Sequence, residues 1–578
     1  MVSLIERPFV GLMAHGAVLS AIRRFQPTIG YASARTRCPQ GQSSGVRLSI
    51  KLRVAWALIG VALAHGAAAS AAVRTQQGLV QGVEQRDLTV YKGLPFAAPP
   101  IGEWRWRPPQ PPRSWSGVLE ANAFKPRCMQ VGSSGPGSAA DEPMSEDCLY
   151  LNIWSPEKAA GAHLPVMLWI YGGGFQNGAG SYPYQLGDQL ARKGVVVVTF
   201  NYRLGTLGFL ALAELSAESG HHASGNYGLM DMIAALQWVK SNIAAFGGDP
   251  DNVTIFGVSA GSWAVSMLMA SPLAHGLFQR AIGESGASFK PPNGNRDLPQ
   301  AKGRLGEAEQ YGKALEARLG ARSLAELRAL PAAKVIAAGP AFSIIDGYVL
   351  PDQTYTVFDE GKQNDVPLLV GHTSGEGDMT ANVGSAQAYV HALREQAGPL
   401  AERLLALFPA RSQAEAAASQ RRFETEYSFA WEAWIWGRLQ SRTGRSRVFE
   451  YDFDHRPPYP DEEPYKSWGV PHMAELFYLF QHYAPDWTWT PTDYRVADLM
   501  SRYWVNFARS GDPNGPGLPR WQPFDEAHQR VMHMGDSFAM SDLPHRQALE
   551  AIDELVGLLR MRDATARAAG HDRRAPHQ

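Results

Sequence analysis

The pentapeptide Gly257-Val258-Ser259-Ala260-Gly261 is the clearest chemical feature of this 578-residue sequence. It matches the pattern G-x-S-x-G, in which a serine sits on a strained turn between a strand and a helix and projects its hydroxyl above a sheet. Glycines leave room for such a turn. Val253–Phe256 before it favours a strand, and Ala260–Ala270 after it favours a helix. This context predicts that Ser259 is a nucleophile.

A second match to the pattern, Gly41-Gln42-Ser43-Ser44-Gly45, has no such context. It lies in a basic leader, with neither a strand before it nor a helix after it. Because the chain has 57 glycines, matches by chance are expected. The surrounding elements, and not the pattern alone, select Ser259.

A glycine run upstream could stabilise the charge that serine attack creates. The tetrahedral intermediate of acyl transfer needs hydrogen-bond donors for its negative oxygen. Tyr171-Gly172-Gly173-Gly174-Phe175 directly follows the predicted strand Leu164–Ile170, and bare glycines let backbone N–H groups converge on a ligand oxygen. We expect Gly173, Gly174 and Ala260 to form this oxyanion hole.

The elements that must position these residues alternate between strands and helices. Five short runs rich in β-branched residues are predicted strands: Leu164–Ile170, Gly194–Phe200, Asn252–Gly257, Val366–Gly371 and Arg447–Phe453. Several are apolar without alternation, as is typical of parallel strands covered on both faces. Gly228–Phe246 has apolar residues at three- and four-residue spacing, which predicts a helix. The alternation predicts an α/β doubly wound sheet.

Further segments along the chain carry a family resemblance. They are Gly93-Leu94-Pro95-Phe96-Ala97, Pro99-Pro100-Ile101-Gly102, Ser145-Glu146-Asp147-Cys148-Leu149-Tyr150-Leu151-Asn152, Asn201-Tyr202-Arg203, Gly225-Asn226-Tyr227-Gly228, Phe246-Gly247-Gly248-Asp249-Pro250 and Phe507-Ala508-Arg509-Ser510-Gly511-Asp512-Pro513-Asn514. With the triple glycine and the serine pentapeptide, they make nearly all of the chain after the leader resemble the type B carboxylesterase and cholinesterase family. The resemblance implies an α/β-hydrolase fold with large helical insertions, hydrolysis of carboxylic esters, no cofactor, and a Ser-Glu-His triad.

The acid of such a triad follows the nucleophile in sequence, and the histidine comes last. After the predicted strand Val366–Gly371 come two carboxylates, Glu376 and Asp378. Spacing alone favours neither, and the resemblance places the acid at Glu376, with Asp378 as the rival. A buried carboxylate here would fix the histidine tautomer and stabilise the imidazolium.

The resemblance also points to one histidine among 16. His472, in Gly469-Val470-Pro471-His472, matches a late Gly-x-x-His element of the family and lies beyond the predicted strand Arg447–Phe453. It is the expected base, with His455 and His482 as weaker alternatives.

Three further expectations concern residues around the site. Ser285 resembles a serine that supports the catalytic residues of the family, although an ordinary turn residue would look the same. Cys128 and Cys148 match a family cysteine pair that flanks a surface loop, which implies a disulfide. An aromatic cluster is predicted to be core or, less often, to line an acyl pocket; its members are Phe423, Tyr427, Phe429, Trp431, Trp434 and Trp436.

Composition excludes other classes of protein. Lys and Arg total 54 against 55 Asp and Glu, a net charge of −1, so nothing indicates nucleic-acid binding. Three cysteines are too few for a disulfide-dense scaffold or a four-cysteine zinc site. The pair His221-His222 lacks the helical spacing of a zinc motif, so no metal is indicated.

The amino-terminal region is typical of an exported protein. Arg47, Lys51 and Arg53 precede the apolar run Val54–Ala64, and small residues follow it. We predict a signal peptide over residues 46–72, cleaved near Ala72, with no stable membrane insertion afterwards and a secreted or periplasmic location. Residues 1–45 are a basic leader or reflect a start codon placed too early. Residues 73–560 are expected to form one catalytic domain, and residues 561–578 a disordered tail.

The sequence therefore predicts a serine carboxylesterase that hydrolyses small neutral esters through an acyl-enzyme intermediate. Cholinesterases carry a glutamate before the nucleophile and a tryptophan in the cysteine-bounded loop. Here Val258 precedes Ser259, and Met129–Asp147 contains no Phe, Trp or Tyr, so a cationic substrate is not favoured. The alternatives are a non-catalytic binding module of the same family, or a hydrolase of amides, carbamates or lactones. The oligomeric state stays open.

Overall fold

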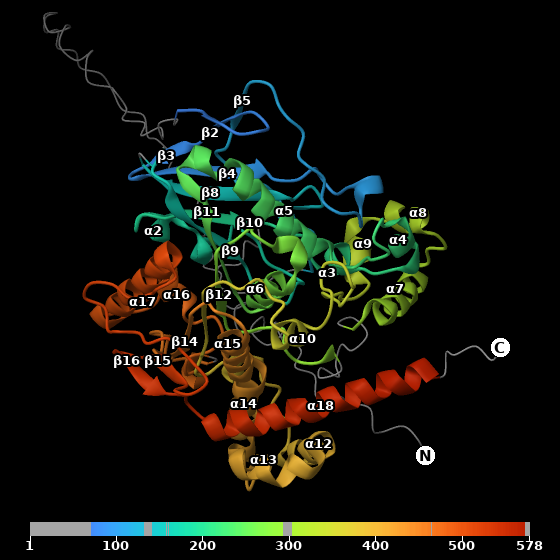
Figure 1. The fold of residues 1–578 in the computed structure, drawn as a ribbon, viewed down its shortest axis with the longest axis vertical. Coiled ribbons are helices and arrows are strands. Elements are labelled where there is room, and N and C mark those ends of the chain that lie inside the picture. Colours follow the sequence, from blue (N-terminus) through green and yellow to red (C-terminus); the bar gives the residue numbers. More distant parts are fainter. Residues whose placement is uncertain are drawn as a thin grey trace, which may run out of the picture.

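A computed structural model describes residues 71–131, 142–157, 159, 161–292, 303–463 and 465–572. Its centre is a sheet of eleven strands among these residues, in the order β16-β15-β14-β13-β12-β11-β9-β10-β8-β4-β3 (Figure 1). Their bounds are β3 Val83–Gln85, β4 Leu88–Pro95, β8 Tyr150–Pro156, β9 Leu164–Ile170, β10 Val196–Phe200, β11 Gly248–Val258, β12 Arg280–Glu284, β13 Leu368–Thr373, β14 Val448–Phe453, β15 Arg530–Met534 and β16 Phe538–Asp542. Two small sheets lie outside it. One contains β1 (Val73–Arg74), β2 (Leu79–Gln81) and β5 (Val118–Glu120), and the other contains β6 (Arg127–Cys128) and β7 (Met144–Ser145).

The middle of the sheet is parallel, as the sequence predicts. All pairs from β10 through β9, β11, β12, β13 and β14 to β15 are parallel. The edges are antiparallel, with β8, β4 and β3 on one side and β16 on the other. Every residue of β10, β13 and β14 is buried, because both faces of the sheet are covered. All five predicted strands are present, with ends shifted by a few residues.

Helices surround this sheet. The longer ones are α5 (Tyr227–Asn242), α6 (Ala260–Ala270), α7 (Leu305–Leu319), α12 (Ala386–Ala397), α14 (Gln413–Thr425), α15 (Trp431–Thr443), α17 (Pro491–Ser510) and α18 (Arg546–Asp572). The shorter ones are α2 (Asp188–Ala191), α3 (Gly205–Phe209), α4 (Ala213–Glu218), α8 (Leu324–Ala329), α9 (Ala332–Ala337), α10 (Thr354–Asp359), α11 (Gly377–Thr380), α13 (Ala401–Leu407) and α16 (Leu476–Leu479). The predicted helix Gly228–Phe246 is present as α5 followed by a 3-10 turn, Ile243–Phe246.

Two neighbouring residues of β12 show how the layers lie. Successive side chains of a strand point to opposite faces of its sheet. A Cβ atom on Gly283 would lie 2.3 Å from the Trp436 ring of α15, whereas the carboxyl group of Glu284 accepts a hydrogen bond from Trp504 of α17 at 2.7 Å. Helices α15 and α17 therefore cover opposite faces, and the sheet is the central layer of an α/β fold.

The carboxyl-terminal helix overturns one expectation. A disordered tail is predicted from residue 561, but α18 continues to Asp572 and lies across the molecule below the sheet in Figure 1. Arginine and alanine are good helix formers, and Asp563 is buried where it accepts a hydrogen bond from Gln353 at 3.4 Å. Packing therefore holds the helix beyond residue 560, as far as Asp563. Residues 573–578 lie outside the described part.

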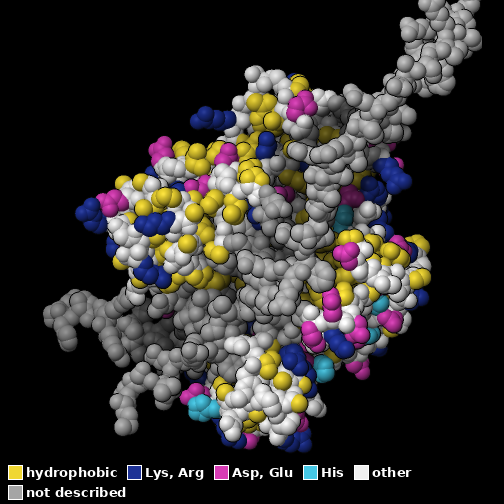
Figure 2. Space-filling view, turned by 180° about the vertical axis from the view of Figure 1, so that it is seen from behind, with side chains coloured by type: hydrophobic (Ala, Val, Ile, Leu, Met, Phe, Trp, Pro, Cys, Tyr) yellow, Lys and Arg dark blue, Asp and Glu magenta, His cyan; other side chains and the backbone are white. Residues whose placement is uncertain are grey.

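The predicted leader also lies outside the described residues, except for Ala71 and Ala72. Within the described part, no helix combines the length and the apolar character that crossing a membrane requires. On the face shown in Figure 2, basic and acidic side chains are interspersed with apolar ones. This mixture agrees with the net charge of −1.

Candidate active site

Ser259 occupies the turn between β11 and α6. Its φ of 57° and ψ of −122° place a non-glycine residue in a backbone region that costs on the order of 1–3 kcal/mol. Its N–H donates to the carbonyl oxygen of Glu284 on the neighbouring β12 at 2.9 Å. This geometry is that of a nucleophile elbow at the carboxyl edge of a parallel sheet.

The second glycine of the pentapeptide is required by a close approach. A Cβ atom on Gly261 would lie 1.9 Å from the carbonyl oxygen of Ile170, at the end of β9. Any larger residue would push the first turn of α6 away from this strand. The motif glycine thus sets the distance between helix and sheet on which the elbow depends.

The register of four adjacent strands brings the predicted site to one edge. Val258 of β11 pairs with Glu284 of β12, Glu284 with Gly371 of β13, and Gly371 with Tyr451 of β14. Ser259, Glu376 and His472 each come after the carboxyl end of one of these strands. Residues that are up to 213 positions apart in sequence therefore belong to one edge of the sheet.

Glu376 and His472 form a buried pair. The Nδ1 atom of His472 lies 2.5 Å from the Oε2 atom of Glu376, and both side chains are buried. The other oxygen of Glu376 accepts the N–H of Thr373 at 2.9 Å. Within the described part, the Nε2 atom of His472 is buried and has no hydrogen-bond partner. An imidazole held this way can accept a proton at Nε2.

The pairing changes the pKa values of both groups. Burial disfavours the imidazolium, but the charge of Glu376 and its hydrogen bond outweigh burial and raise the pKa of His472 above its ordinary value. Burial likewise opposes the carboxylate, yet His472 holds the pKa of Glu376 below its ordinary value. Opposite charges in contact favour each other's charged form.

The alternative residues have other partners. Asp378 accepts the N–H of Gly469 at 2.8 Å, so it holds the loop that carries His472 without contacting the imidazole. His455 lies between Asp493 and Asp536, at 3.0 and 2.6 Å. His482 pairs with Asp188 at 2.7 Å. Neither histidine contacts Glu376.

The glycine loop after β9 leaves backbone donors free. Gly173 has a φ of 109°, and a Cβ atom there would lie 2.1 Å from the carbonyl oxygen of Asn177, so only glycine fits. The N–H of Ala260 begins α6 and has no partner within the helix. For Gly173, Gly174 and Ala260, the hydrogen bonds of the described residues include no acceptor for these N–H groups. They are available to a ligand oxygen.

The hydroxyl of Ser285 has a partner that sequence reasoning missed. The backbone N–H of Ser285 donates to the carbonyl oxygen of Gly371 on β13 at 2.8 Å. Its hydroxyl donates to the Oε1 atom of Glu475 at 3.3 Å. Glu475, three residues after His472, had no signal beyond its place in the His472 segment.

The aromatic cluster divides between core and site. Trp431, Trp434 and Trp436 are buried in the main core. Phe429 instead packs against the imidazole of His472, with ring centroids 4.8 Å apart. It lies in a single π-helical turn, Glu426–Ala430, between α14 and α15, and such turns are frequent at functional sites.

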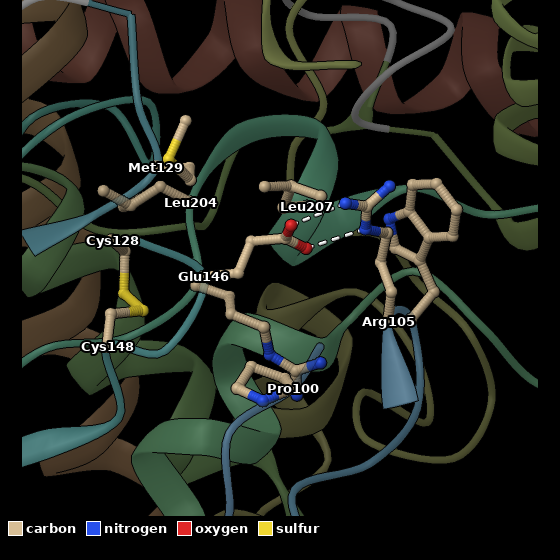
Figure 3. A pocket seen from close by; sticks show the side chains of 10 residues that line it. Pro100, Arg105, Cys128, Met129, Glu146, Cys148, Leu204 and Leu207 are labelled. Carbon is tan, nitrogen blue, oxygen red and sulfur yellow. Dashed lines mark hydrogen bonds and ion pairs between the residues drawn. A yellow bond between two sulfur atoms is a disulfide. The ribbon is translucent and has the colours of Figure 1, made fainter. Parts of the chain in front are cut away.

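The cavity in Figure 3 lies beside the disulfide and not at Ser259. Cys128 and Cys148 are bonded, with Cα atoms 5.0 Å apart. Arg105 makes two hydrogen bonds to Glu146, at 2.7 and 2.5 Å. Because this charge pair is already satisfied, we assign the cavity no catalytic group.

Comparisons with known proteins agree with this fold. A model of the carboxylesterase family matches residues 69–552. The chain is 38% identical over 490 residues to fumonisin B1 esterase of Sphingopyxis macrogoltabida, which covers 80% of this chain and 86% of that protein. It is 34% identical over 503 residues to para-nitrobenzyl esterase of Bacillus subtilis (strain 168), which covers 82% and 97%. It is 33% identical over 479 residues to human cocaine esterase, which covers 76% and 82%.

Solved structures agree as well. A PNB esterase aligns with a TM-score of 0.71 and 34% identity, and a thermophilic PNB esterase with 0.72 and 32%; each alignment covers 83% of this chain and 99% of the other. The α/β-hydrolase fold expected from the sequence is confirmed. The chain belongs to the carboxylesterase family and is a carboxylic ester hydrolase.

Proposed function

We propose that the chain is a serine carboxylesterase that hydrolyses neutral esters through an acyl-enzyme intermediate. Ser259 attacks the ester carbonyl carbon while Nε2 of His472 takes its hydroxyl proton. Glu376 holds the imidazole tautomer and stabilises the imidazolium. The N–H groups of Gly173, Gly174 and Ala260 bind the oxyanion. The imidazolium protonates the leaving alcohol, and water, activated by His472, then releases the acid.

One observation carries this proposal. The buried Glu376–His472 hydrogen bond of 2.5 Å leaves the Nε2 atom of His472 without a partner in the described part, at the sheet edge where Ser259 sits on its strained turn. A relative that had lost catalysis would have no need of this arrangement. Neutral esters are favoured because Val258 precedes the nucleophile, so the glutamate of cholinesterases is missing. Amides, carbamates and lactones remain candidate substrates of the same machinery.

Export is part of the proposal. The basic and apolar pattern of residues 46–72 and the Cys128–Cys148 disulfide both favour a secreted or periplasmic location, because disulfides persist in oxidising compartments.

Labelling with a fluorophosphonate tests the nucleophile. Peptide mapping should find the label on Ser259, and Ser259→Ala should lower kcat/KM for aryl esters by about 10⁴-fold or more. Ser271→Ala is a matched control, because Ser271 ends the same helix and its hydroxyl has no hydrogen-bond partner in the described part. Label on Ser285, or full activity of Ser259→Ala, would contradict the proposal.

A further inference from the structure

Trp263 is the one residue of α6 that is not buried. The helix runs from Ala260 to Ala270, and every other residue in it is buried. Large aromatic side chains gain most from burial, so an accessible tryptophan on an otherwise buried helix borders a space that solvent reaches. Because α6 begins at the nucleophile, the place of Trp263 relative to Ser259 decides what this space is.

Trp263 lies one helical turn after the nucleophile. Its backbone N–H donates to the carbonyl oxygen of Ser259 at 2.9 Å. Side chains four residues apart lie on the same face of a helix, and each leans toward the amino terminus of the helix. The indole of Trp263 therefore leans toward the turn that carries Ser259.

The indole lies between the two loops that flank the nucleophile. On one side its ring packs edge-on against Phe175, with ring centroids 6.0 Å apart and an angle of 67° between the planes. Phe175 directly follows Gly174 of the proposed oxyanion hole. On the other side, a Cβ atom on Gly286 after β12 would lie 2.9 Å from Nε1 of Trp263 and 3.1 Å from the carbonyl oxygen of Ser259. The accessible space at the indole is thus part of the site around the nucleophile.

Both neighbours hold the indole in place. Phe175 is fully buried, and Gly286 leaves room for the ring only because it has no side chain. A ring that is packed on both sides cannot turn away without disturbing its neighbours. It therefore limits what fits beside Ser259.

The proposed mechanism orients an ester in this site. The carbonyl oxygen faces the N–H groups of the oxyanion hole, and the leaving oxygen must face Nε2 of His472, which protonates it. The acyl chain then extends away from His472. Phe429 packs against the imidazole of His472, on the leaving-group side, whereas Trp263 packs against the glycine loop. Trp263 therefore borders the acyl chain.

We propose that Trp263 is a specificity-determining residue: its indole closes the acyl side of the site, so that Ser259 accepts esters of short carboxylic acids and excludes long acyl chains. The inference rests on the proposed serine esterase function and names a substrate class for it. A long chain would have to displace an aromatic ring that Phe175 and Gly286 hold in place.

A series of p-nitrophenyl esters from acetate to decanoate tests this limit, because the leaving alcohol is the same throughout. Wild-type kcat/KM should be highest for the shortest acyl chains and should fall toward decanoate. Trp263→Ala should raise the ratio of kcat/KM for decanoate to that for acetate by about tenfold or more, because each methylene that a pocket accepts is worth about tenfold or more. This ratio does not depend on the fraction of the enzyme that is active.

Two controls separate the acyl side from other effects of the substitution. Trp104→Ala makes the same truncation in the 3-10 turn Gly102–Trp104, where Trp104 is 41% exposed, and it should leave the acyl ratio unchanged. In a series of acetates of different alcohols, Trp263→Ala should keep the wild-type order of kcat/KM, because the leaving group lies on the side of His472.

Three results would overturn the proposal. The first is a wild type that hydrolyses the decanoate as well as the acetate. The second is an unchanged acyl ratio in a Trp263→Ala protein that folds. The third is a changed order of alcohols in place of a changed acyl ratio. If Trp263→Ala does not fold, Trp263→Phe should shift the acyl ratio in the same direction, because a phenyl ring is smaller than an indole, and an unchanged ratio there refutes the proposal as well.

Ser259→Ala separates this inference from the proposed function. Full activity of Ser259→Ala would refute the serine mechanism itself. If Ser259→Ala is inactive and Trp263→Ala leaves the acyl ratio unchanged, the esterase function stands and only the role of Trp263 is refuted.

Discussion

At the scale of single residues, contacts in the folded protein distinguish two carboxylates that residue type and spacing do not. Glu376 and Asp378 are two positions apart at the start of α11, and by residue type either could pair with a distant histidine. One lies 2.5 Å from His472, and the other supports the N–H of Gly469. Both carboxylates anchor the segment that carries His472, but only Glu376 contacts the imidazole and can stabilise its positive charge.

We therefore expect Glu376→Gln and Asp378→Asn to differ strongly. Glu376→Gln should lower kcat by about 10⁴-fold, the scale of losing a triad carboxylate, whereas Asp378→Asn should cost less than about tenfold. The wild-type kcat/KM should fall as the pH drops through a His472 pKa that is raised above its ordinary value, because protonated Nε2 cannot accept the serine proton. In Glu376→Gln this acid limb should move to lower pH. The reverse order of the two variants would assign the acid to Asp378.

Substrate charge is also decided by single residues. Val258 and the absence of Phe, Trp and Tyr from Met129–Asp147 remove a charge and an aromatic ring, and a desolvated cation–π contact is worth about 2 kcal/mol. We expect aryl or short alkyl esters to exceed acylcholines of equal acyl length in kcat/KM. A clear acylcholine preference in this comparison would require another aromatic group to bind the cation.

At the scale of elements, the elbow depends on how closely α6 packs on β9. Gly261→Ala should lower the melting temperature and the activity together, because its Cβ atom would lie 1.9 Å from the Ile170 carbonyl oxygen. Gly557→Ala within α18 is the control. It has no neighbour within 4 Å of the added atom and should stabilise the protein by about 0.5–1 kcal/mol. Thermal unfolding of both variants checks this, and an unimpaired Gly261→Ala would show that the strand and helix can separate.

The π-helical turn between α14 and α15 also affects the site at this scale, because it carries Phe429. The additional residue of such a turn changes the direction of the side chains that follow. Phe429 thereby contacts His472, while Trp431, Trp434 and Trp436 point into the core. On a regular helix Phe429 would lie seven residues before Trp436 and on the same face, and for this reason the two roles could not be separated beforehand.

At the scale of the whole molecule, the disulfide links the fold to its compartment. The Cys128–Cys148 bridge closes a loop of 20 residues, which stabilises the protein by roughly 3 kcal/mol in the chain-entropy model. Thiol titration of the mature, denatured and unreduced protein should find no free cysteine, because Cys38 precedes the predicted cleavage site. Two titratable thiols would contradict both the bridge and the proposed export.

The sequence by itself determined the features that depend only on neighbouring residues along the chain. The apolar runs of β9, β10 and β13 identify buried parallel strands. The elbow at Ser259 follows from Gly257 and Gly261, which lie between a predicted strand and a predicted helix. A short segment carries its own backbone preference and burial pattern, so these features need no distant partner.

The tertiary structure decided the rest. Glu376 and His472 are 96 residues apart, and only the register of β11 to β14 brings them to one edge of the sheet. Likewise, α18 continues beyond residue 560 because Asp563 meets Gln353 from a segment 210 residues earlier. Contacts between distant segments are made by packing and leave no local trace in the sequence.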